Sequence, residues 1–589
     1  MADKARSRSG GHGHAGRLPH LQHSPRRRAS GRRGSADRVN SPASRLWILL
    51  AVFAGGWFCN LGYRHLIKPD EGRYAEIPRE MVVSGDWLTP RLNGYKYFEK
   101  PPLQYWMTAA AFTAFGQNEW AARLWPGVTG FLGVLLVFWA GNRLFGPPVG
   151  LYGAAVAASS AIYASIGHVL TLDMALCVFM SASVFAFAVA QSDPAGDAER
   201  RRWMLLAWAA AALAVLSKGL VGIVLPAGAA ALYVLIERDW KLLGRLHALG
   251  GGLLFLAIAA PWFIAVSLAN PEFLRFFFIH EHFERFTTRE HGRYQPVWYF
   301  VPVLLAGVLP WIVDLFPALG RAWTRVPETR FQPRRFLLLW CVVVFAFFSA
   351  SDSKLGSYIL PIFPALAVLI GIHLASASPR FALAEGVVAA LLGIALAAAS
   401  LWASANLPKA LALLETDLPP ELVAGYLPWL TVGGIVLAAG GIASASLCGR
   451  RATAALTLGL GGLAWVQIVL SGHETLAPAF SAYHVVQKIR GDVKPDIPFY
   501  VVDTFDHTLP FYLNRTVTMV GYKDELAQSI AWEPRKFLPD AVAFVRAWQA
   551  DREAFAMFNA NDLDGFLKAH PVPMRIVARD PRRVIVRKP

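Results

Sequence analysis

Two neighbouring carboxylates, Asp70 and Glu71, come shortly after the first apolar stretch of the chain. A group-transfer reaction at a membrane surface would use such residues to position a substrate or to accept a proton. The residues that follow place apolar side chains three and four positions apart, which predicts a short amphipathic helix ending near Gly85. The alternative is that Asp70 only caps this helix, and spacing alone does not separate the two interpretations.

A second polar cluster lies at residues 95–102, where Tyr97, Glu99 and Lys100 precede two prolines. A proline at the start of the next helix would hold Glu99 and Lys100 at a rigid corner. The simpler interpretation is that the aromatic rings anchor the chain at the membrane interface. On that interpretation the lysines would only bind anionic lipid headgroups.

Further candidates lie at the ends of other apolar stretches. They are His168, Asp173, Lys218, the stretch 278–285 with His280, His282 and Arg285, and the stretch 353–358 with Lys354 and Tyr358. A lysine flanked by serine and glycine also fits an ordinary turn, so each is a weak signal alone. His280 and His282 would point apart on a helix, which argues against a histidine-only metal site. One histidine could still join Glu99 in holding a divalent ion.

The composition sets the class of protein that must position these residues. Of 589 residues, 55% are hydrophobic and only 16% are charged, whereas soluble domains carry about 25% charged residues. At about 20 residues per crossing, the chain has room for a dozen or so spans, which excludes a soluble protein and a single-pass receptor. The four cysteines all lie in or beside apolar segments, so we expect no disulfide framework and no cysteine metal site.

We expect an all-α polytopic membrane protein with a small α/β domain at its carboxy-terminal end. Residues 1–45 are rich in Arg, Ser, Gly and His and should form a disordered basic cytoplasmic tail. Residues 46–472 should form the membrane domain, and residues 473–589 the α/β domain, with strands near 497–502 and 516–520, a helix near 539–550 and a hairpin around Asp580-Pro581.

Thirteen spans are expected. They are roughly 46–66, 121–142, 148–166, 169–190, 203–217, 219–236, 248–268, 297–318, 336–350, 356–375, 382–403, 427–447 and 452–471. This count places the basic loops on the side of the tail, as the positive-inside rule requires, so the net charge of +17 reflects membrane orientation and not a nucleic-acid partner. The stretch 102–116 is short and is expected to lie along the interface.

Four short sequence motifs resemble those of a known family. Asp70-Glu71-Gly72-Arg73-Tyr74-Ala75-Glu76, Ser84-Gly85-Asp86-Trp87-Leu88-Thr89-Pro90-Arg91, Tyr97-Phe98-Glu99-Lys100-Pro101-Pro102 and Leu216-Ser217-Lys218-Gly219 resemble the bacterial protein-mannosyltransferase-like glycosyltransferases of the GT-C fold. Within that superfamily the chain is similar to the lipid A aminoarabinose transferases over residues 46–589. These motifs are specific for the superfamily, but they are less specific for the sugar that is transferred.

The resemblance implies an activity and a set of roles. Such enzymes move 4-amino-4-deoxy-L-arabinose from undecaprenyl phosphate to lipid A at the periplasmic face of the bacterial inner membrane, without a nucleotide, and so confer resistance to polymyxin. By resemblance Asp70 and Asp173 would be the catalytic acids. Tyr97, Lys100, Lys218, Arg285 and Tyr358 would bind the donor and its lipid phosphate, and Glu99 with His280 would hold zinc.

Two other functions remain open at this point. A related polyprenyl-phosphate-dependent transferase could use another sugar or acceptor, and with a protein hydroxyl as acceptor Asp70 would become the general base. A lipid or polysaccharide transporter is the non-enzyme alternative. The expected spans carry few ionisable residues near their middle, whereas ion-coupled carriers usually place carboxylates there, so the transporter is disfavoured.

Overall fold

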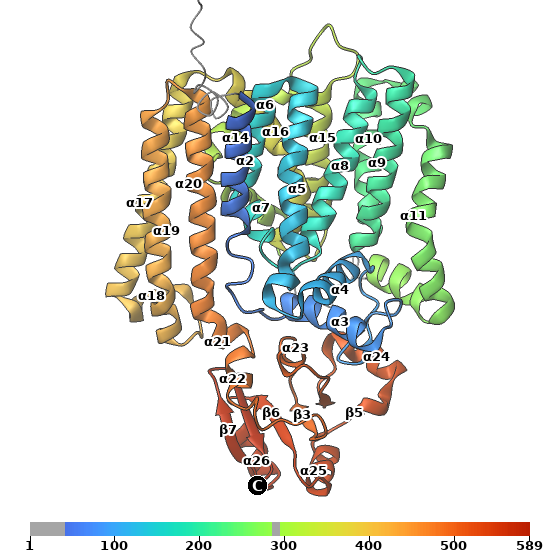
Figure 1. Cartoon of the computed structure of the whole chain (residues 1–589), viewed down its shortest axis with the longest axis vertical. Coiled ribbons are helices and arrows are strands. Elements are labelled where there is room, and N and C mark those ends of the chain that lie inside the picture. Colours follow the sequence, from blue (N-terminus) through green and yellow to red (C-terminus); the bar gives the residue numbers. More distant parts are fainter. Residues whose placement is uncertain (1–41, 285–294) are drawn as a thin grey trace, which may run out of the picture. The chain divides into compact units, whose positions relative to one another are not determined.

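The computed structural model describes residues 42–284 and 295–589 (Figure 1). Contacts divide the chain into residues 1–52 and residues 53–589. The described part of the first unit is the beginning of helix α2 (Pro42–Phe58). The predicted disorder of the tail falls mainly on residues 1–41, outside the described residues, and the predicted boundary at residue 45 already lies within α2.

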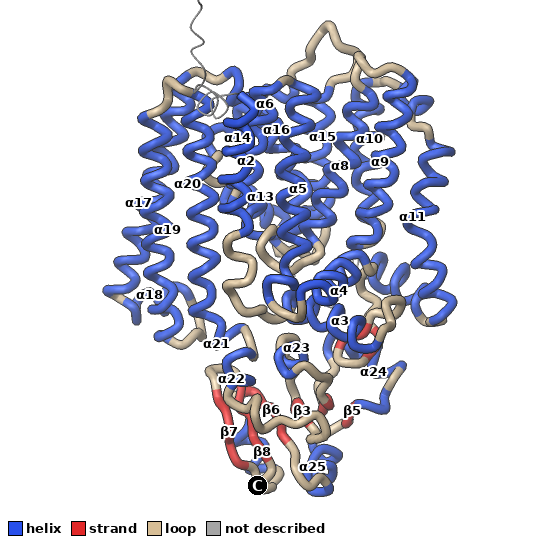
Figure 2. Tube along the Cα trace, in the orientation of Figure 1, coloured by secondary structure: helices blue, strands red, loops and turns tan. Residues whose placement is uncertain are grey.

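Long apolar helices make up most of the second unit (Figure 2). Among the described residues, eight helical segments are long and apolar enough to cross a membrane, or nine if one bent pair counts as a single span. The eight are α5 (Glu119–Phe145), α8 (Asp173–Gln191), α11 (Ala248–Ala269), α15 (Pro333–Ala350), η4 with α16 (Gly356–Ser376), α17 (Pro379–Ala405), α19 (Pro420–Ser446) and the segment Arg451–Phe480. This last segment begins with α20 (Arg451–Gly472). A multi-pass membrane fold is therefore confirmed.

The other predicted spans also coincide with helices, but not all of these helices pass the same test of length and apolarity. α6 (Pro147–Ser159) and α10 (Val221–Glu237) are short, and α9 (Asp197–Lys218) begins with charged residues. α13 (Phe300–Gly307) and α14 (Ile312–Trp323) belong to the pair that bends by 115°. Pro310 lies at the break, and its missing N–H cannot continue a helix. The count of thirteen stays a prediction.

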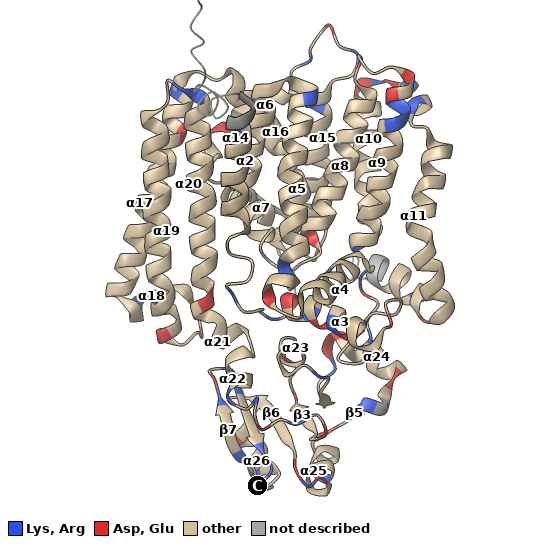
Figure 3. Cartoon of the chain, viewed as in Figure 1, with Lys and Arg blue, Asp and Glu red and all other residues tan. Residues whose placement is uncertain are grey.

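The first predicted span is shorter than expected. Helix α2 ends at Phe58, and residues 59–69 form turns that lead to α3 (Asp70–Ser84). The charged residues of the long helices lie mostly at their ends (Figure 3), as the apolar interior of a membrane demands.

Two short helices lie beside the ends of the spans. Helix α3 ends as predicted at Gly85, whose φ of 72° is the left-handed conformation that glycine adopts readily, and whose N–H donates to the carbonyl of Met81. Helix α4 (Leu103–Phe115) has 13 residues, is too short to span a bilayer, and packs against α3 and α5. The predicted exposed face of α3 is wrong, because residues 71–81 are buried.

The carboxy-terminal region covers α3. Helix α23 (Leu509–Leu513) packs against α3, and the approach is so close that a Cβ on Gly72 would lie 2.5 Å from the carbonyl carbon of His507. Only glycine avoids this overlap with backbone. Gly72 therefore allows the carboxy-terminal domain to reach the membrane-domain loop that carries Asp70.

The predicted α/β domain is confirmed. Its six strands follow the order β5-β4-β3-β6-β8-β7. They are β3 (Phe499–Val502), β4 (Thr518–Val520), β5 (Phe537–Leu538), β6 (Phe555–Asn559), β7 (Arg575–Arg579) and β8 (Arg583–Arg587). β5, β4, β3 and β6 are parallel, and β8 and β7 form the antiparallel hairpin predicted around Asp580-Pro581. Helix α25 (Ala541–Ala550) matches the predicted helix.

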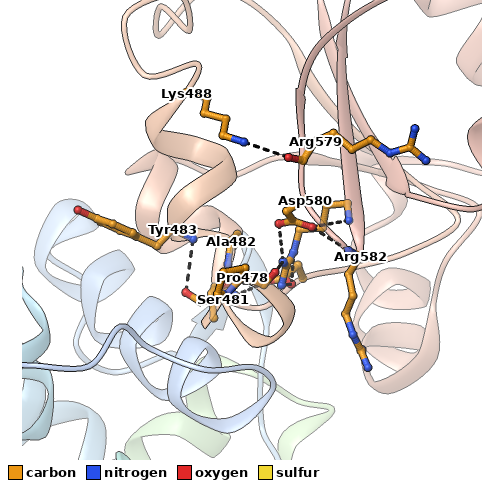
Figure 4. Close-up of polar contacts among 11 residues, drawn as sticks. Pro478, Ser481, Ala482, Tyr483, Lys488, Arg579, Asp580 and Arg582 are labelled. Atoms are coloured by element: carbon orange, nitrogen blue, oxygen red, sulfur yellow. Dashed lines mark hydrogen bonds and ion pairs between the residues drawn. The ribbon is translucent and has the colours of Figure 1, made fainter. Parts of the chain in front are cut away.

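A buried arginine, Arg583, joins this sheet to the segment that enters the domain. Figure 4 labels two of the residues that it contacts, Pro478 and Asp580. Arg583 Nε donates to Asp506 Oδ2 at 2.8 Å, and Nη1 donates to Asp580 Oδ2 at 2.8 Å and to the carbonyl of Pro478 at 3.3 Å. Burial alone would raise the pKa of Asp506, but Arg583 and Lys68 outweigh it and lower that pKa to about 2. The ion pair therefore persists at every physiological pH.

Replacing Arg583 by Met should destabilise the domain, because Asp506 would be left as a buried, uncompensated charge. Such losses cost about 3–5 kcal/mol. A carboxyl whose pKa is lowered on folding stabilises the fold above its unfolded pKa, and this contribution disappears as the pH falls through the folded value. The deficit of Arg583→Met should accordingly be largest near neutral pH and shrink below about pH 4.

Thermal unfolding of the full chain in nanodiscs, followed by protease sensitivity of the domain, measures this effect. Arg582→Met is the matched control, because Arg582 is exposed and adjacent. Equal stability of the two variants at pH 7 would contradict the role assigned to Arg583.

Candidate functional site

One cavity of about 530 Å³ collects most of the predicted site residues. Of the nine residues to which the resemblance assigns roles, seven line it: Asp70, Glu99, Lys100, Asp173, Lys218, His280 and Tyr358. They come from segments that are far apart in the sequence, namely α3, the turn before α4, the ends of α8 and α9, the helical segment η2 (Arg275–Glu284) and η4 (Gly356–Ile362). Carboxylates and cationic groups therefore face the same space, as recognition of a phosphate-linked sugar would require.

Asp70 is the first residue of α3, and its carboxylate faces this cavity. Its side chain is 41% exposed and accepts a hydrogen bond from Arg73 Nη1 at 2.9 Å. The preceding residue, Pro69, occupies the capping position, and no side chain caps the helix. The interpretation of Asp70 as merely a helix cap is therefore wrong.

Glu71 has a different role from its neighbour. Its carboxylate is fully buried and accepts hydrogen bonds from Arg123 Nε and Nη2, each at 2.7 Å, and from the backbone N–H of Leu170 at 3.0 Å. Burial would raise the pKa of Glu71, but Arg123 holds it down at about 2. Glu71 does not line the cavity, so of the two adjacent carboxylates only Asp70 is available to a substrate.

Asp173 and Lys218 form an ion pair at the wall of the cavity. Asp173 begins α8 and Lys218 ends α9, directly before Gly219, which has a φ of 100°. The Lys218 ammonium also lies 4.8 Å from the centre of the Tyr358 ring, within the range of a cation–π contact. The turn therefore does more than connect two helices, because it holds a lysine at the cavity.

Glu99, Lys100 and His280 occupy another part of the wall. Lys100 Nζ donates to the Glu99 carbonyl at 2.8 Å and lies 3.9 Å from Glu99 Oε2. A carboxylate and an imidazole are both zinc ligands. Among the described side chains, no third histidine, cysteine or carboxylate forms a tight group with these two. A metal held here would have to complete its coordination with water or with oxygens of a substrate.

Of the two remaining residues, Tyr97 does not line the cavity. Tyr97 is 1% exposed, lies with its ring 6.0 Å from the Arg73 guanidinium, and has a pKa raised well above its ordinary value by burial. Its assignment as a residue that touches the donor stays a prediction. Arg285 lies outside the described residues.

The carboxy-terminal domain contributes residues that sequence reasoning missed. Arg73, which also bonds Asp70, donates to both carboxylate oxygens of Glu525, and His507 Nε2 lies 2.5 Å from Glu525 Oε1. Arg73, Glu525 and His507 all line the cavity. Burial would raise the pKa of Glu525, but Arg73 and His507 lower it to about 2. Asp70 is thereby tied through Arg73 to the second domain.

Residue spacing does not predict this contact, because Glu525 and His507 lie more than 400 residues beyond Asp70 and belong to none of the four sequence motifs. Arg73 does belong to the first motif, and its position three residues after Asp70 on one helix face could have predicted its contact with Asp70.

Glu525→Gln should lower transfer activity, because Arg73 loses its charged partner in the second domain and its hold on Asp70 becomes less well oriented. Misplacement of a catalytic group by about 1 Å can cost about a hundredfold in rate, so we expect a loss of tenfold to a hundredfold in kcat. Glu533→Gln is the matched control, because Glu533 forms a half-exposed ion pair with Arg91 and does not line the cavity.

Steady-state kinetics of the purified proteins measure this loss. The hypothesis predicts that Asp70→Asn and Glu525→Gln together cost little more than Asp70→Asn alone. Additive losses would contradict a role of Glu525 that acts through Asp70.

Comparison with known proteins agrees with this geometry. Residues 43–280 match the family model described as dolichyl-phosphate-mannose-protein mannosyltransferase, and residues 485–588 match the one described as aminoarabinose transferase C-terminal domain. An arabinosyl transferase of Sodalis glossinidius, named for undecaprenyl phosphate-alpha-4-amino-4-deoxy-L-arabinose, is 34% identical over 400 residues, which are 66% of this chain and 71% of that protein. Its Pseudomonas aeruginosa counterpart is 36% identical over 329 residues, covering 55% and 58% of the two chains.

Solved structures extend the match to nearly the whole chain. The crystal structure of ArnT from Cupriavidus metallidurans bound to undecaprenyl phosphate superimposes with a TM-score of 0.86 at 37% identity, covering 93% of this chain and 98% of that one. Its apo structure gives a TM-score of 0.85 at 38% identity, covering 92% and 98%.

The fold and the cavity thus define a multi-pass membrane glycosyltransferase of the protein-mannosyltransferase-like class. Within that class, the chain belongs to the family of undecaprenyl phosphate-4-amino-4-deoxy-L-arabinose arabinosyl transferases. The family membership predicted from the four sequence motifs is confirmed.

Proposed function

We propose that this chain transfers 4-amino-4-deoxy-L-arabinose from undecaprenyl phosphate to a phosphate of lipid A. Membership of the arabinosyl transferase family supports the donor. The observation that carries the proposal is the cavity itself, in which two carboxylates, Asp70 and Asp173, and two lysines, Lys100 and Lys218, face one space of about 530 Å³. That space suits a sugar joined to a phosphate.

The reaction exchanges one bond at the anomeric carbon of the sugar. The bond from this carbon to the donor phosphate oxygen breaks, undecaprenyl phosphate leaves with the electron pair, and an oxygen of the acceptor phosphate forms the new bond. Negative charge grows on the departing phosphate, so cationic groups that face it stabilise the transition state. Lys100 and Lys218 are the cationic groups at the cavity wall that serve this purpose, and Tyr358 helps to orient Lys218.

The acceptor needs no strong base. A phosphate monoester has a second pKa near ~6 and is largely deprotonated at neutral pH, so it can attack directly. Asp70 then orients the acceptor or the donor sugar, and Arg73 fixes the direction in which its carboxylate points. With a hydroxyl as acceptor, Asp70 would instead have to take up a proton.

Glu99 and His280 would hold a divalent ion, for which zinc fits a carboxylate and an imidazole. When bound, such an ion would supply positive charge next to the phosphate. We propose that the reaction uses no nucleotide.

The charge distribution supports a periplasmic site in the inner membrane. Lys and Arg residues gather at the helix ends opposite α3 and α4 (Figure 3). Arg143 lies in the last turn of α5, Arg200 near the start of α9 and Arg451 at the start of α20. Cytoplasmic loops carry an excess of these residues. The cavity and the carboxy-terminal domain then lie on the periplasmic side, where lipid A is accessible.

Asp70→Asn should abolish transfer and leave the fold intact. The amide oxygen can still accept the hydrogen bond from Arg73, but the variant lacks the carboxylate charge at the cavity, and we expect at least about a hundredfold loss of activity. Mass spectrometry of lipid A from a deletion strain carrying each variant measures it, with Asp417→Asn, an exposed aspartate outside the cavity, as the control.

The outcomes separate the alternatives. Aminoarabinose on lipid A with the wild type and with Asp417→Asn, but not with Asp70→Asn at equal protein levels, supports the proposal. Unmodified lipid A with the wild-type chain, in cells that make the donor, would refute the acceptor and favour a related transferase or a transporter.

A further inference from the structure

Three potential metal ligands converge outside the cavity. They are His65, in the turns between α2 and α3, Glu474, in the helical turn η5 (His473–Leu476), and His484, in α22 (Tyr483–Gln487). One ligand atom from each lies within 4.8 Å of the other two. His65 Nδ1 is 2.5 Å from Glu474 Oε1, and His484 Nε2 is 3.8 Å from the same oxygen.

The three side chains are held in place by their neighbours. Glu474 Oε2 accepts the backbone N–H of His65 at 2.8 Å, which turns Oε1 toward both imidazoles. The His65 ring stacks on Tyr483 with 3.5 Å between ring centres. The next backbone N–H, that of Leu66, donates to the Tyr512 hydroxyl at 2.7 Å. Such supporting contacts orient the ligands of metal sites.

The site is open enough to admit an ion. The side chains of His65, Glu474 and His484 are 21%, 19% and 41% exposed, so an ion and a water ligand can reach them. They are also partly buried, so water screens the attraction between the Glu474 carboxylate and a cation less than it would at a fully exposed site.

We propose that His65, Glu474 and His484 bind a divalent transition-metal ion, with zinc as the ion that fits best. Two imidazoles and one carboxylate are an established zinc donor set, with a water molecule as fourth ligand. Bonds of about 2.0–2.2 Å require the ligand atoms to lie farther apart than the hydrogen-bonded His65 and Glu474 do. The ion would therefore take the place of the hydrogen bond between these two side chains, which must move apart to bind it.

The ion would clamp the chain at the junction of its two domains. His65 lies five residues before Asp70, in the turn whose carbonyls bond Arg123. Glu474 and His484 flank the segment where the membrane domain gives way to the carboxy-terminal domain. Figure 4 shows this segment next to the sheet, with Lys488 Nζ donating to the carbonyl of Arg579 and the Tyr483 ring pointing away, toward the membrane-domain helices. The clamp shares no residue with the catalytic cavity.

Binding of Co²⁺ and Zn²⁺ to the full chain in nanodiscs tests the proposal. Tetrahedral cobalt gives visible absorption bands, and elemental analysis after dialysis gives the zinc stoichiometry. His484→Ala is the chosen variant, because His484 is the most exposed ligand and its loss should not disturb folding. His570→Ala, in the same domain but outside the cluster, is the matched control.

We expect His484→Ala to bind one equivalent of ion fewer than the wild type and His570→Ala, or to bind it at least tenfold more weakly. Zinc should raise the thermal midpoint of the wild type and His570→Ala more than that of His484→Ala, since binding to the folded state alone stabilises it. Because the readout is a difference between variants, an ion at Glu99 and His280 does not affect it. Equal stoichiometry, affinity and zinc-dependent stabilisation in all three proteins would overturn the proposal and leave an ordinary histidine–glutamate pair.

Discussion

The buried ion pair between Glu71 and Arg123 is the constraint on which the site depends. Both side chains are fully buried, and an ion pair in such a place is maintained only when its remaining hydrogen-bonding groups are satisfied. Here they are satisfied by backbone: the pair also bonds the carbonyls of Leu61, Arg64 and His65 and the N–H groups of Ile67 and Leu170. One interaction thus fixes the turn before α3, the first residues of α3 and the segment before α8.

The position of Asp70 follows from that constraint. Glu71 faces inward toward α5, so the residue before it points away, to the cavity. The segment before α8 is held by the same pair, and Asp173 is brought to the same wall. The carboxy-terminal domain completes the arrangement, because Gly72 lets residue 507 approach α3 and Arg73 reaches Glu525. The second domain therefore supplies part of the wall of the cavity.

Much of this could be predicted from the sequence, for identifiable reasons. Apolar stretches long enough to cross a bilayer are visible in one dimension, and so are the alternating strands of the last domain. Residues such as Glu99, Lys100 and Lys218 stand in polar motifs at the ends of apolar segments, and the resemblance of those motifs to a known family singled them out. The different fates of Asp70 and Glu71 could not be predicted, because they depend on Arg123, 52 residues away. Glu525 and His507 were missed for the same reason, and the burial of Tyr97 away from the cavity lining has no signature in the sequence.

Membrane-domain loops and the carboxy-terminal domain line one cavity that includes Asp70, and we propose that this cavity binds a polyprenyl phosphate. The most direct measurement is an electron cryomicroscopy structure of the full chain in nanodiscs with undecaprenyl phosphate. We expect phosphate density within hydrogen-bonding distance of Lys100 or Lys218, in the cavity that Asp70 and Glu525 line. Phosphate density outside that cavity, for example at the apolar groove between α8, α9 and α10, would contradict it.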